Sequence, residues 1–319
     1  FKQMIWSRLV GDQTAKLSRQ GRLGFFAPTA GEEASQMGSN FAMTKDDFLL
    51  GAYRDVPQLI KHGLSLAKGF MWSKGHYNAN DYPEELNALP PQIIIGAQYA
   101  QTAGVALGIK LNGDKKVAYT YTGDGGTSQG DFYEGINFAG AYQAPAVFFV
   151  QNNGYAISVP RKLQTAAPTL AQKGVAAGIP SIVVDGMDAL AVYAAAKQAR
   201  DYAVEGNGPV IIETLTYRYG PHTLSGDDPT RYRTKEEEDE WHAKDPLVRM
   251  RKFLTDKGLW DDAKEEAYNA EVAKEIDDAI KEVESQPAQK ASDFLKFEFV
   301  DTPGAIQREI DEYEEKEAK

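Results

Sequence analysis

Short apolar runs alternate along the middle of the chain with longer stretches in which apolar and small residues recur at helical spacing. The short runs are of strand length and predict strands; they lie at 116–122, 146–151, 182–184 and 209–216. The stretches at 98–110 and 189–203 predict helices. Because these strand-like runs do not alternate with polar residues, we expect an α/β fold whose parallel sheet is covered by helices on both faces.

Two turns in this α/β region carry polar side chains directly after a predicted strand. Residues 123–126 read GDGG, and residues 152–154, after the next strand, read NNG. Ser128 is a suitable N-cap, with Asp131 three residues later, for a helix that would run to about Tyr142. Because ligands of open parallel sheets bind beyond the carboxyl ends of the strands, we expect a site where the two turns meet.

The side chains of these turns favour a hard cation and an anion. Asp124 offers a carboxylate oxygen, Asn153 an amide oxygen and the following turn a free carbonyl oxygen, which suits Mg²⁺ or Ca²⁺ rather than zinc. The predicted helix N-terminus near Ser128 would attract an anion to the same place. Asp124 alone would be an ordinary turn residue, so the prediction depends on its pairing with Asn153. The sequence contains neither a complete dinucleotide fingerprint nor a P-loop.

Composition and charge narrow the class of protein. The chain has 319 residues, no cysteine and a net charge of −11, so disulfides, thiolate metal sites and cysteine nucleophiles are excluded. Residues 235–319 carry 14 Lys and Arg against 26 Asp and Glu, and predict an acidic helical extension packed on an α/β domain of residues 1–234. Without a basic stripe or an uninterrupted apolar span, we expect no nucleic-acid or membrane partner, and the absence of cysteine fits a cytoplasmic protein.

The same segments resemble one family. Residues 122–158 (TGDGGTSQGDFYEGINFAGAYQAPAVFFVQNNGYAIS) are similar to the α subunits of thiamine-diphosphate-dependent 2-oxoacid dehydrogenases. Further matches follow in the family's order: LGAYRD at 50–55, IIIGAQ at 93–98, VDGMDALAVY at 184–193 and YRYGPHTLSGDDPTRYR at 217–233. The resemblance covers essentially the whole chain and implies the family's three-layer thiamine-diphosphate-binding fold with a mostly parallel sheet.

Carried over to this chain, the resemblance implies a cofactor site. Thiamine diphosphate would be held through Mg²⁺, ligated by the side chains of Asp124 and Asn153 and by the carbonyl of Tyr155. The other cofactor-binding residues that it implies are Tyr53, Arg54, Ile93, Ile95, Gly123, Gly125, Gly126 and His222. The Tyr-Arg pair and the glycines would lie at the diphosphate, and the backbone of the two isoleucines at the aminopyrimidine.

His222 is the residue that we expect to act in the chemistry. It lies in a long polar loop and matches a family histidine beside the diphosphate, implicated in acyl transfer to lipoamide; Tyr232 and Arg233 would order that loop. Asp131 and Glu134 lie three residues apart, hence on one helix face. The resemblance links this pair to an acidic, water-filled tunnel that carries protons between two active sites. An equally open interpretation is that the two acids are simply placed favourably near a helix N-terminus.

The resemblance also implies an activity and partners. The expected reaction is oxidative decarboxylation of a 2-oxo acid with reductive acetylation of a lipoyl group. The branch that acts on pyruvate is the most similar; branched-chain 2-oxo acids and acetoin are the alternatives, and an inert scaffold subunit is the alternative outside the enzymes. The chain has no room for the second α/β module that supplies a glutamate to the aminopyrimidine. We therefore expect a β subunit in an α₂β₂ heterotetramer, bound to the lipoyl and subunit-binding domains of a dihydrolipoyl acyltransferase.

Overall fold

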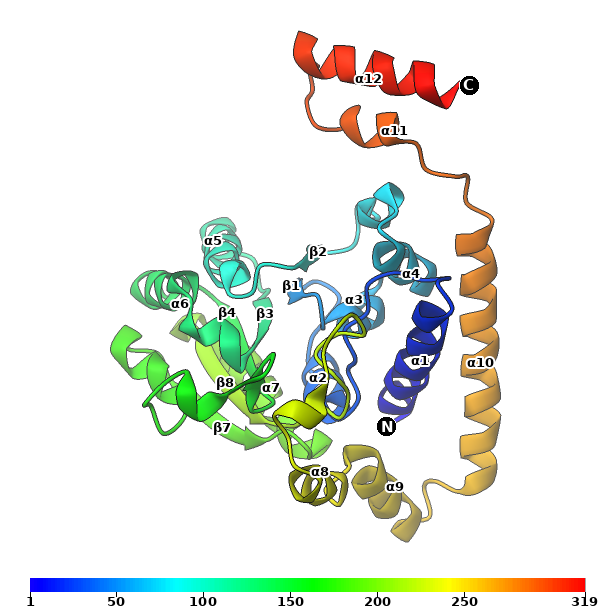
Figure 1. The fold of residues 1–319 in the computed structure, drawn as a ribbon. Helices are drawn as coiled ribbons and strands as arrows, with labels where there is room; N and C mark the ends of the chain where they lie inside the picture. The colour runs from blue at the N-terminus through cyan, green and yellow to red at the C-terminus, as the bar shows by residue number, and fades with distance from the viewer. Residues whose placement is uncertain (319) are drawn as a thin grey trace.

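The apolar runs of the sequence form the centre of one six-stranded sheet in the computed structural model, which describes residues 1–318 (Figure 1). Its strands are β1 (Phe48–Ala52), β2 (Ala88–Gln92), β3 (Ala118–Gly123), β4 (Ala146–Asn152), β7 (Ser181–Asp185) and β8 (Val210–Leu215). The order is β2-β1-β3-β4-β8-β7, and every neighbouring pair is parallel. A separate antiparallel hairpin joins β5 (Tyr155–Ala156) to β6 (Val159–Pro160).

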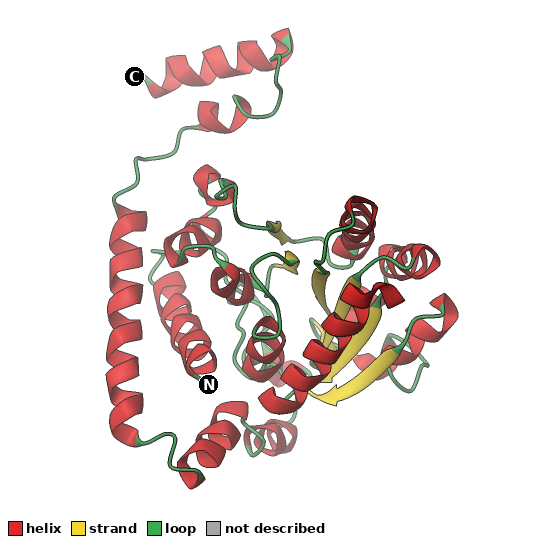
Figure 2. Ribbon diagram, turned by 180° about the vertical axis from the view of Figure 1, so that it is seen from behind, coloured by secondary structure: helices red, strands yellow, loops and turns green. Residues whose placement is uncertain are grey.

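Helices cover both faces of this sheet, as the two opposite views show (Figures 1 and 2). One layer holds α2 (Glu33–Asn40), α3 (Val56–His62) and α7 (Ala189–Tyr202), and the other holds α5 (Ala97–Asn112) and α6 (Gly130–Tyr142). Successive strand residues point to opposite faces. Tyr119 and Tyr121 therefore pack in the core beneath α3 and α7, whereas Ala118 and Phe148 pack beneath α5 and α6. The predicted parallel sheet with two helical layers is confirmed.

The remaining helices lie beside and beyond the sheet. They are α1 (Lys2–Arg19), α4 (Leu66–Lys74), α8 (Lys235–His242), α9 (Pro246–Asp256), α10 (Asp262–Glu284), α11 (Ala291–Leu295) and α12 (Gly304–Glu317). Helix α10 packs along α1 and α4 through Trp6, Phe70 and Ile276, among others. Helices α11 and α12 pack on each other and stand away from the α/β body in both views (Figures 1 and 2). The division of the chain at residue 234 stays a prediction.

Shorter helical turns complete the chain. They are the 3₁₀ segments η1 (Tyr77–Asn80), η2 (Asp124–Ser128), η3 (Arg161–Leu163), η4 (Ala171–Ala177) and η6 (Pro229–Arg231), and the π-type turn η5 (Ala203–Asn207). Segment η2 shows that the predicted N-cap at Ser128 was wrong. The chain continues in a 3₁₀ turn through Ser128, so Gln129 precedes α6 and contributes no side-chain cap bond. Within residues 1–318, no helix combines the length and apolarity that a membrane crossing requires.

Candidate active site

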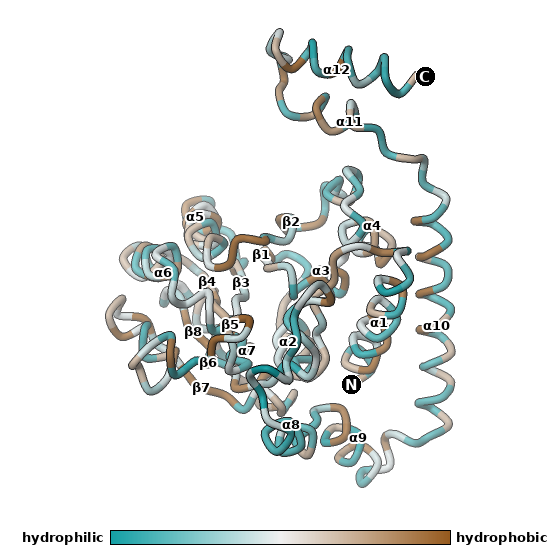
Figure 3. The backbone as a smooth tube through the Cα atoms, viewed as in Figure 1, coloured by the Kyte–Doolittle hydropathy of each residue, from teal (hydrophilic) through white to brown (hydrophobic). Residues whose placement is uncertain are grey.

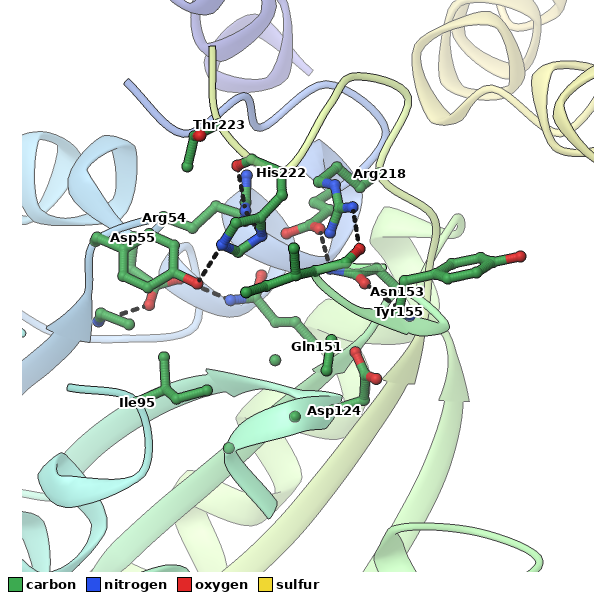
Figure 4. A pocket seen from close by; sticks show the side chains of 18 of the residues that line it. Arg54, Asp55, Ile95, Asp124, Gln151, Asn153, Tyr155, Arg218, His222 and Thr223 are labelled. Carbon is green, nitrogen blue, oxygen red and sulfur yellow. Dashed lines mark hydrogen bonds between the residues drawn. The ribbon is translucent and has the colours of Figure 1, made fainter. Parts of the chain in front are cut away.

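The carboxyl ends of four parallel strands deliver the side chains of one cavity of about 360 Å³ (Figure 4). In the register of β3 and β4, Gly123 lies beside Gln151, so the two turns that follow these strands leave the sheet next to each other. Strand β1 leads directly into Tyr53 and Arg54, and β8 leads into the loop that carries His222. The predicted meeting of the two turns at one edge of the sheet is therefore confirmed.

Every residue predicted to bind the cofactor lines this cavity. These residues are Tyr53, Arg54, Ile93, Ile95, Gly123, Asp124, Gly125, Gly126, Asn153, Tyr155 and His222. The residues that line it without having been predicted are Phe25, Glu32, Ala52, Asp55, Gln151, Ala156, Ile157, Arg218 and Thr223. The structure thus brings the predicted set together, while the role of each residue stays a prediction.

The glycine-rich turn η2 forms one wall of the cavity with its backbone. The hydroxyl of Thr127 donates a hydrogen bond to the carbonyl of Asp124 at 2.7 Å and closes the turn. A Cβ atom on Gly126 would lie 2.0 Å from the Thr122 Oγ1, and one on Gly125 would lie 2.7 Å from the Cβ of Ala156. Only glycine fits at these two positions, which leaves the backbone open to a closely bound ligand.

Beside this turn lie a buried carboxylate oxygen without a partner and an amide oxygen with one. Asp124 is 1% exposed; its Oδ2 accepts a hydrogen bond from Gln164 Nε2 at 2.6 Å, and its Oδ1 has no hydrogen-bond partner. Burial raises the pKa of this carboxyl. The Oδ1 of Asn153 accepts from the backbone N–H of Tyr155 at 3.2 Å. Because unsatisfied buried oxygens are costly, a carboxylate and an amide oxygen at this edge fit a hard cation.

Two buried guanidinium groups also line the cavity. Arg54 donates to the carbonyl oxygens of Pro28 and His222, the latter at 3.0 Å, and Arg218 donates to the carbonyl of Ile157 at 3.1 Å. Burial lowers the pKa of Arg54, and the neighbouring charge of Arg218 lowers it further, although Glu32 opposes the shift. Two positive charges at low exposure favour an anionic ligand such as a diphosphate.

His222 is held between these groups as a neutral imidazole. Burial, together with the charges of Arg54 and Arg218, lowers its pKa to about 4. Arg54 Nη2 lies 3.2 Å from the Nδ1 of His222, and because guanidinium can only donate, Nδ1 is the acceptor. The proton of the neutral ring therefore sits on Nε2, which lies 3.5 Å from the hydroxyl of Tyr53.

Tyr232 and Arg233 lie outside the cavity lining and contact the loop that carries His222. The hydroxyl of Tyr232 donates to Asp227 Oδ2 at 2.8 Å, and the backbone N–H of His222 donates to the same carboxylate oxygen. Arg233 donates to the carbonyl of Arg218 at 2.7 Å and packs over aromatic rings. The two residues are therefore placed to hold the loop rather than to touch a ligand.

The acidic pair Asp131 and Glu134 also lies outside the lining of the cavity. Both residues are on α6, where Asp131 is half-buried and Glu134 is exposed. Asp131 lies in the first turn of the helix, where a negative charge is favourable. A proton pathway between two active sites through this pair stays a prediction.

Two buried carboxyl groups of the cavity had no clear signal in the sequence. Asp55 accepts from the backbone N–H of Ala52 at 2.8 Å and from Gln151 Nε2 at 2.6 Å, and burial raises its pKa to about 6. Glu32 is fully buried, and burial raises its pKa as well. Consecutive acids in the run 31–34, which is otherwise small and apolar, are the one hint that the sequence offered.

A glycine-lined cavity with buried arginines at the carboxyl edge of a parallel sheet is typical of α/β proteins that bind a phosphorylated cofactor. Comparison with known proteins narrows this class. The family model described as "Dehydrogenase E1 component" matches residues 1–292. The chain belongs to the dehydrogenase E1 component family and is an enzyme subunit, as the resemblance predicted. The family implies thiamine diphosphate as the cofactor.

Curated relatives agree over the full chain. The "Pyruvate dehydrogenase E1 component subunit alpha" of Staphylococcus aureus (strain MRSA252) is 58% identical over 319 residues, which is 100% of this chain and 86% of the relative. The proteins of the same name from Bacillus subtilis (strain 168) and Staphylococcus epidermidis (strain ATCC 35984) have the same identity and coverage. This chain is thus similar to E1 α subunits from several Gram-positive bacteria.

Proposed function

We propose that this chain is the α subunit of the decarboxylase component of a pyruvate dehydrogenase complex. The observation that carries the proposal is the meeting, in one cavity, of an unsatisfied carboxylate oxygen of Asp124 and the amide oxygen of Asn153 with the buried Arg54 and with His222. The names of relatives that are 58% identical over the whole chain support pyruvate as the substrate. The reaction would be oxidative decarboxylation of pyruvate with reductive acetylation of a lipoyl group.

The cavity fits Mg²⁺ and the diphosphate of thiamine diphosphate. Asp124, Asn153 and the carbonyl of Tyr155 would hold Mg²⁺, since they offer one charge and two neutral oxygens. The backbone of η2 would line the diphosphate, and Tyr53 and Arg54 would contact it. When bound, thiamine diphosphate supplies the electron sink for loss of carbon dioxide from a 2-oxo acid.

The chain's own residues would bind, orient and move protons around that cofactor. Arg54 and Arg218 would neutralise the anion and, through the Arg54–His222 hydrogen bonds, fix the histidine ring against it. His222, neutral at physiological pH, would hold a proton at Nε2 on the cavity side, where it can serve acyl transfer to lipoamide. Tyr232 and Arg233 would keep the loop closed over the site.

An open border of the cavity supports a protein partner. Ile93 and Ile94, between β2 and α5, are 60% and 65% exposed, and Figure 3 shows this segment as a continuous apolar stretch on the outside of the fold. Exposed apolar side chains beside an active site favour an interface. We place a β subunit at this border, where it would complete an α₂β₂ heterotetramer. The heterotetramer would in turn bind the lipoyl and subunit-binding domains of a dihydrolipoyl acyltransferase.

The test uses the native complex captured through this chain and supplied with Mg²⁺ and thiamine diphosphate. Reduction of an artificial electron acceptor is followed with pyruvate and, in parallel, with a branched 2-oxo acid and acetoin. Faster turnover with pyruvate is the expected result. Preference for another substrate would move the chain to a sister enzyme with the same site. No turnover with any substrate, although a β subunit is bound, would favour the scaffold.

A further inference from the structure

Glu32 is a buried carboxylate that lines the cavity and has no role in the proposed cofactor site. It is 0% exposed and lines the cavity from the segment that precedes α2. Its Oε1 accepts a hydrogen bond from Asn153 Nδ2 at 2.8 Å, and its Oε2 has no hydrogen-bond partner. Burial raises the pKa of this carboxyl, and the charges of the nearby Arg54 and Arg218 only partly oppose that shift, so its place beside Asn153 needs a reason.

The hydrogen bond fixes which way the amide of Asn153 points. Because the amide nitrogen of Asn153 donates this bond, the NH₂ end of the amide faces Glu32 and the oxygen does not. The oxygen of Asn153 is thereby directed to the opposite side, where it accepts from the N–H of Tyr155 at 3.2 Å and keeps a second lone pair for a ligand. If the amide turned over, its NH₂ group would face both that N–H and a cation.

We infer that Glu32 is a positioning residue for the cation site, acting through the hydrogen bond that orients Asn153. The inference rests on the proposed function, because it assumes that Asn153 ligates a divalent cation. Supporting groups of this kind orient metal ligands, and their loss typically weakens metal affinity by about 10- to 100-fold. Glu32 itself touches neither the cation nor the substrate.

The chain contains a matched pair that separates positioning from packing. The neighbouring Asn152 donates through Nδ2 to Glu213 Oε1 at 2.7 Å, and Glu213 is 1% exposed. The Oδ1 of Asn152, like that of Asn153, accepts from the backbone N–H two residues later, here that of Gly154 at 3.1 Å. Asn152 does not line the cavity, however. Loss of Glu213 therefore removes the same kind of bond at nearly the same burial, together with the bond that its Oε2 accepts from the N–H of Ala171 at 2.8 Å, and leaves the proposed cation ligands in place.

The experiment measures cation affinity rather than turnover. Complexes of this chain with its β subunit are prepared as wild type, Glu32→Ala, Glu32→Gln and Glu213→Ala. Mn²⁺, whose free form is visible by electron paramagnetic resonance, is titrated at saturating thiamine diphosphate, and the thermal midpoint of each complex is recorded. We expect Glu32→Ala to weaken Mn²⁺ binding by about 10- to 100-fold. Glu32→Gln, which retains an acceptor for Asn153, should stay within about threefold of wild type.

The outcomes separate the inference from its premise. Absence of Mn²⁺ binding by the wild type would contradict the proposed function itself. Normal binding by Glu32→Ala, or an equal loss in Glu213→Ala, would overturn the inference while leaving the function intact. An equal loss in Glu32→Gln and Glu32→Ala would also overturn it, since the charge of Glu32 and not the amide orientation would then matter. If Glu32→Ala does not assemble, Glu32→Asp, with a shorter reach to Asn153, is expected to give an intermediate loss.

Discussion

The cavity is built from two regions that are held in place in different ways. The turns after β3 and β4 are fixed by local backbone geometry: glycines at 125 and 126 that admit no Cβ, and hydrogen bonds that span two or three residues. The loop 216–233 is fixed by contacts between its own distant parts and with β1, such as the Arg54 bonds to His222 and the Arg233 bond to Arg218.

This difference assigns a separate physical task to each region. The turns present fixed oxygen atoms and backbone at the end of a rigid sheet, which suits a cation and a diphosphate. The loop depends on a few hydrogen bonds and ring contacts and can therefore open at a modest cost in free energy. A segment that admits cofactor and substrate has to open in this way. Substitutions in the turns should abolish binding, whereas substitutions in the loop should tune it.

The largest effect is expected from Asp124→Ala in the turn after β3. Removing the only carboxylate among the proposed cation ligands should weaken Mg²⁺-dependent binding of thiamine diphosphate by more than about 100-fold, beyond the range for residues that merely support a ligand. Alanine removes a buried oxygen without a partner, which is favourable, and also the oxygen that accepts from Gln164, which is unfavourable, so the thermal midpoint should change little. Calorimetric titration of cofactor and a thermal melt measure the two quantities. Unchanged cofactor affinity would show that this turn does not bind the metal.

The next effect is expected from Gly126→Ala, which tests the backbone of the same turn. The new Cβ would lie 2.0 Å from the Thr122 Oγ1, so the turn must shift, and overpacking of this kind costs about 1–3 kcal/mol. Urea denaturation measures the loss, and cofactor affinity should fall with it. Gly104→Ala is the control: no heavy atom lies within 4 Å of its Cβ in α5, and alanine there should raise stability by up to about 1 kcal/mol. Equal stability of the two variants would contradict a strained turn.

The same contrast explains what the sequence could predict. Apolar runs and glycine turns are local signals, so strands β3, β4, β7 and β8 were predicted within two residues of their bounds, and the pairing of Asp124 with Asn153 could be read from the turns that follow two of them. Strands β1 and β2 were missed; β2 contains two prolines, which argue against a strand. Glu32 was missed because its partner lies 121 residues away, and no local pattern encodes such a contact. The resemblance to a family, rather than periodicity, supplied His222.

A smaller effect is expected from replacing His222 with Gln, seen in the pH dependence of stability. The folded pKa of His222 is about 4, against an ordinary value of 6.5. Between these values the unfolded chain binds a proton that the folded chain does not, so the free energy of unfolding falls as pH falls from 6.5 to 4. One such group contributes at most about 1.4 kcal/mol per pH unit. His222→Gln should flatten this part of the curve in urea denaturation at pH 7.0, 5.5 and 4.5.

The difference between the two curves isolates His222 from its surroundings. Burial raises the folded pKa of Asp55 to about 6 from its ordinary 3.8, so the folded chain binds the extra proton in that window and stability rises as pH falls. This contribution has the opposite sign and is present in both proteins, and it therefore cancels on subtraction. Parallel curves for wild type and variant would mean that the pKa of His222 is the same in the folded and the unfolded chain, so that burial does not lower it.

The smallest effect is expected from Tyr232→Phe, which tests whether the loop is held by few contacts. The lost hydroxyl donates to Asp227 at 2.8 Å and accepts from Arg218 at 3.3 Å, and Asp227 in turn accepts from the backbone of His222. Its removal should cost the loop about 0.5–1.5 kcal/mol. Amide hydrogen exchange should therefore quicken about 2- to 13-fold around residue 222. Global stability should change less, because the loop opens before the sheet does.

Tyr219→Phe is the matched control for this loop. Its hydroxyl makes one hydrogen bond where that of Tyr232 makes two: it donates to the carbonyl of Trp241 at 3.1 Å, which ties the base of the loop to the end of α8 and not to His222. Exchange around residue 222 should stay at the wild-type rate in this variant. If both tyrosine variants quicken it equally, the loop opens from its base as one unit. If neither does, the arginine contacts hold the loop alone, and it is as rigid as the turns that it faces.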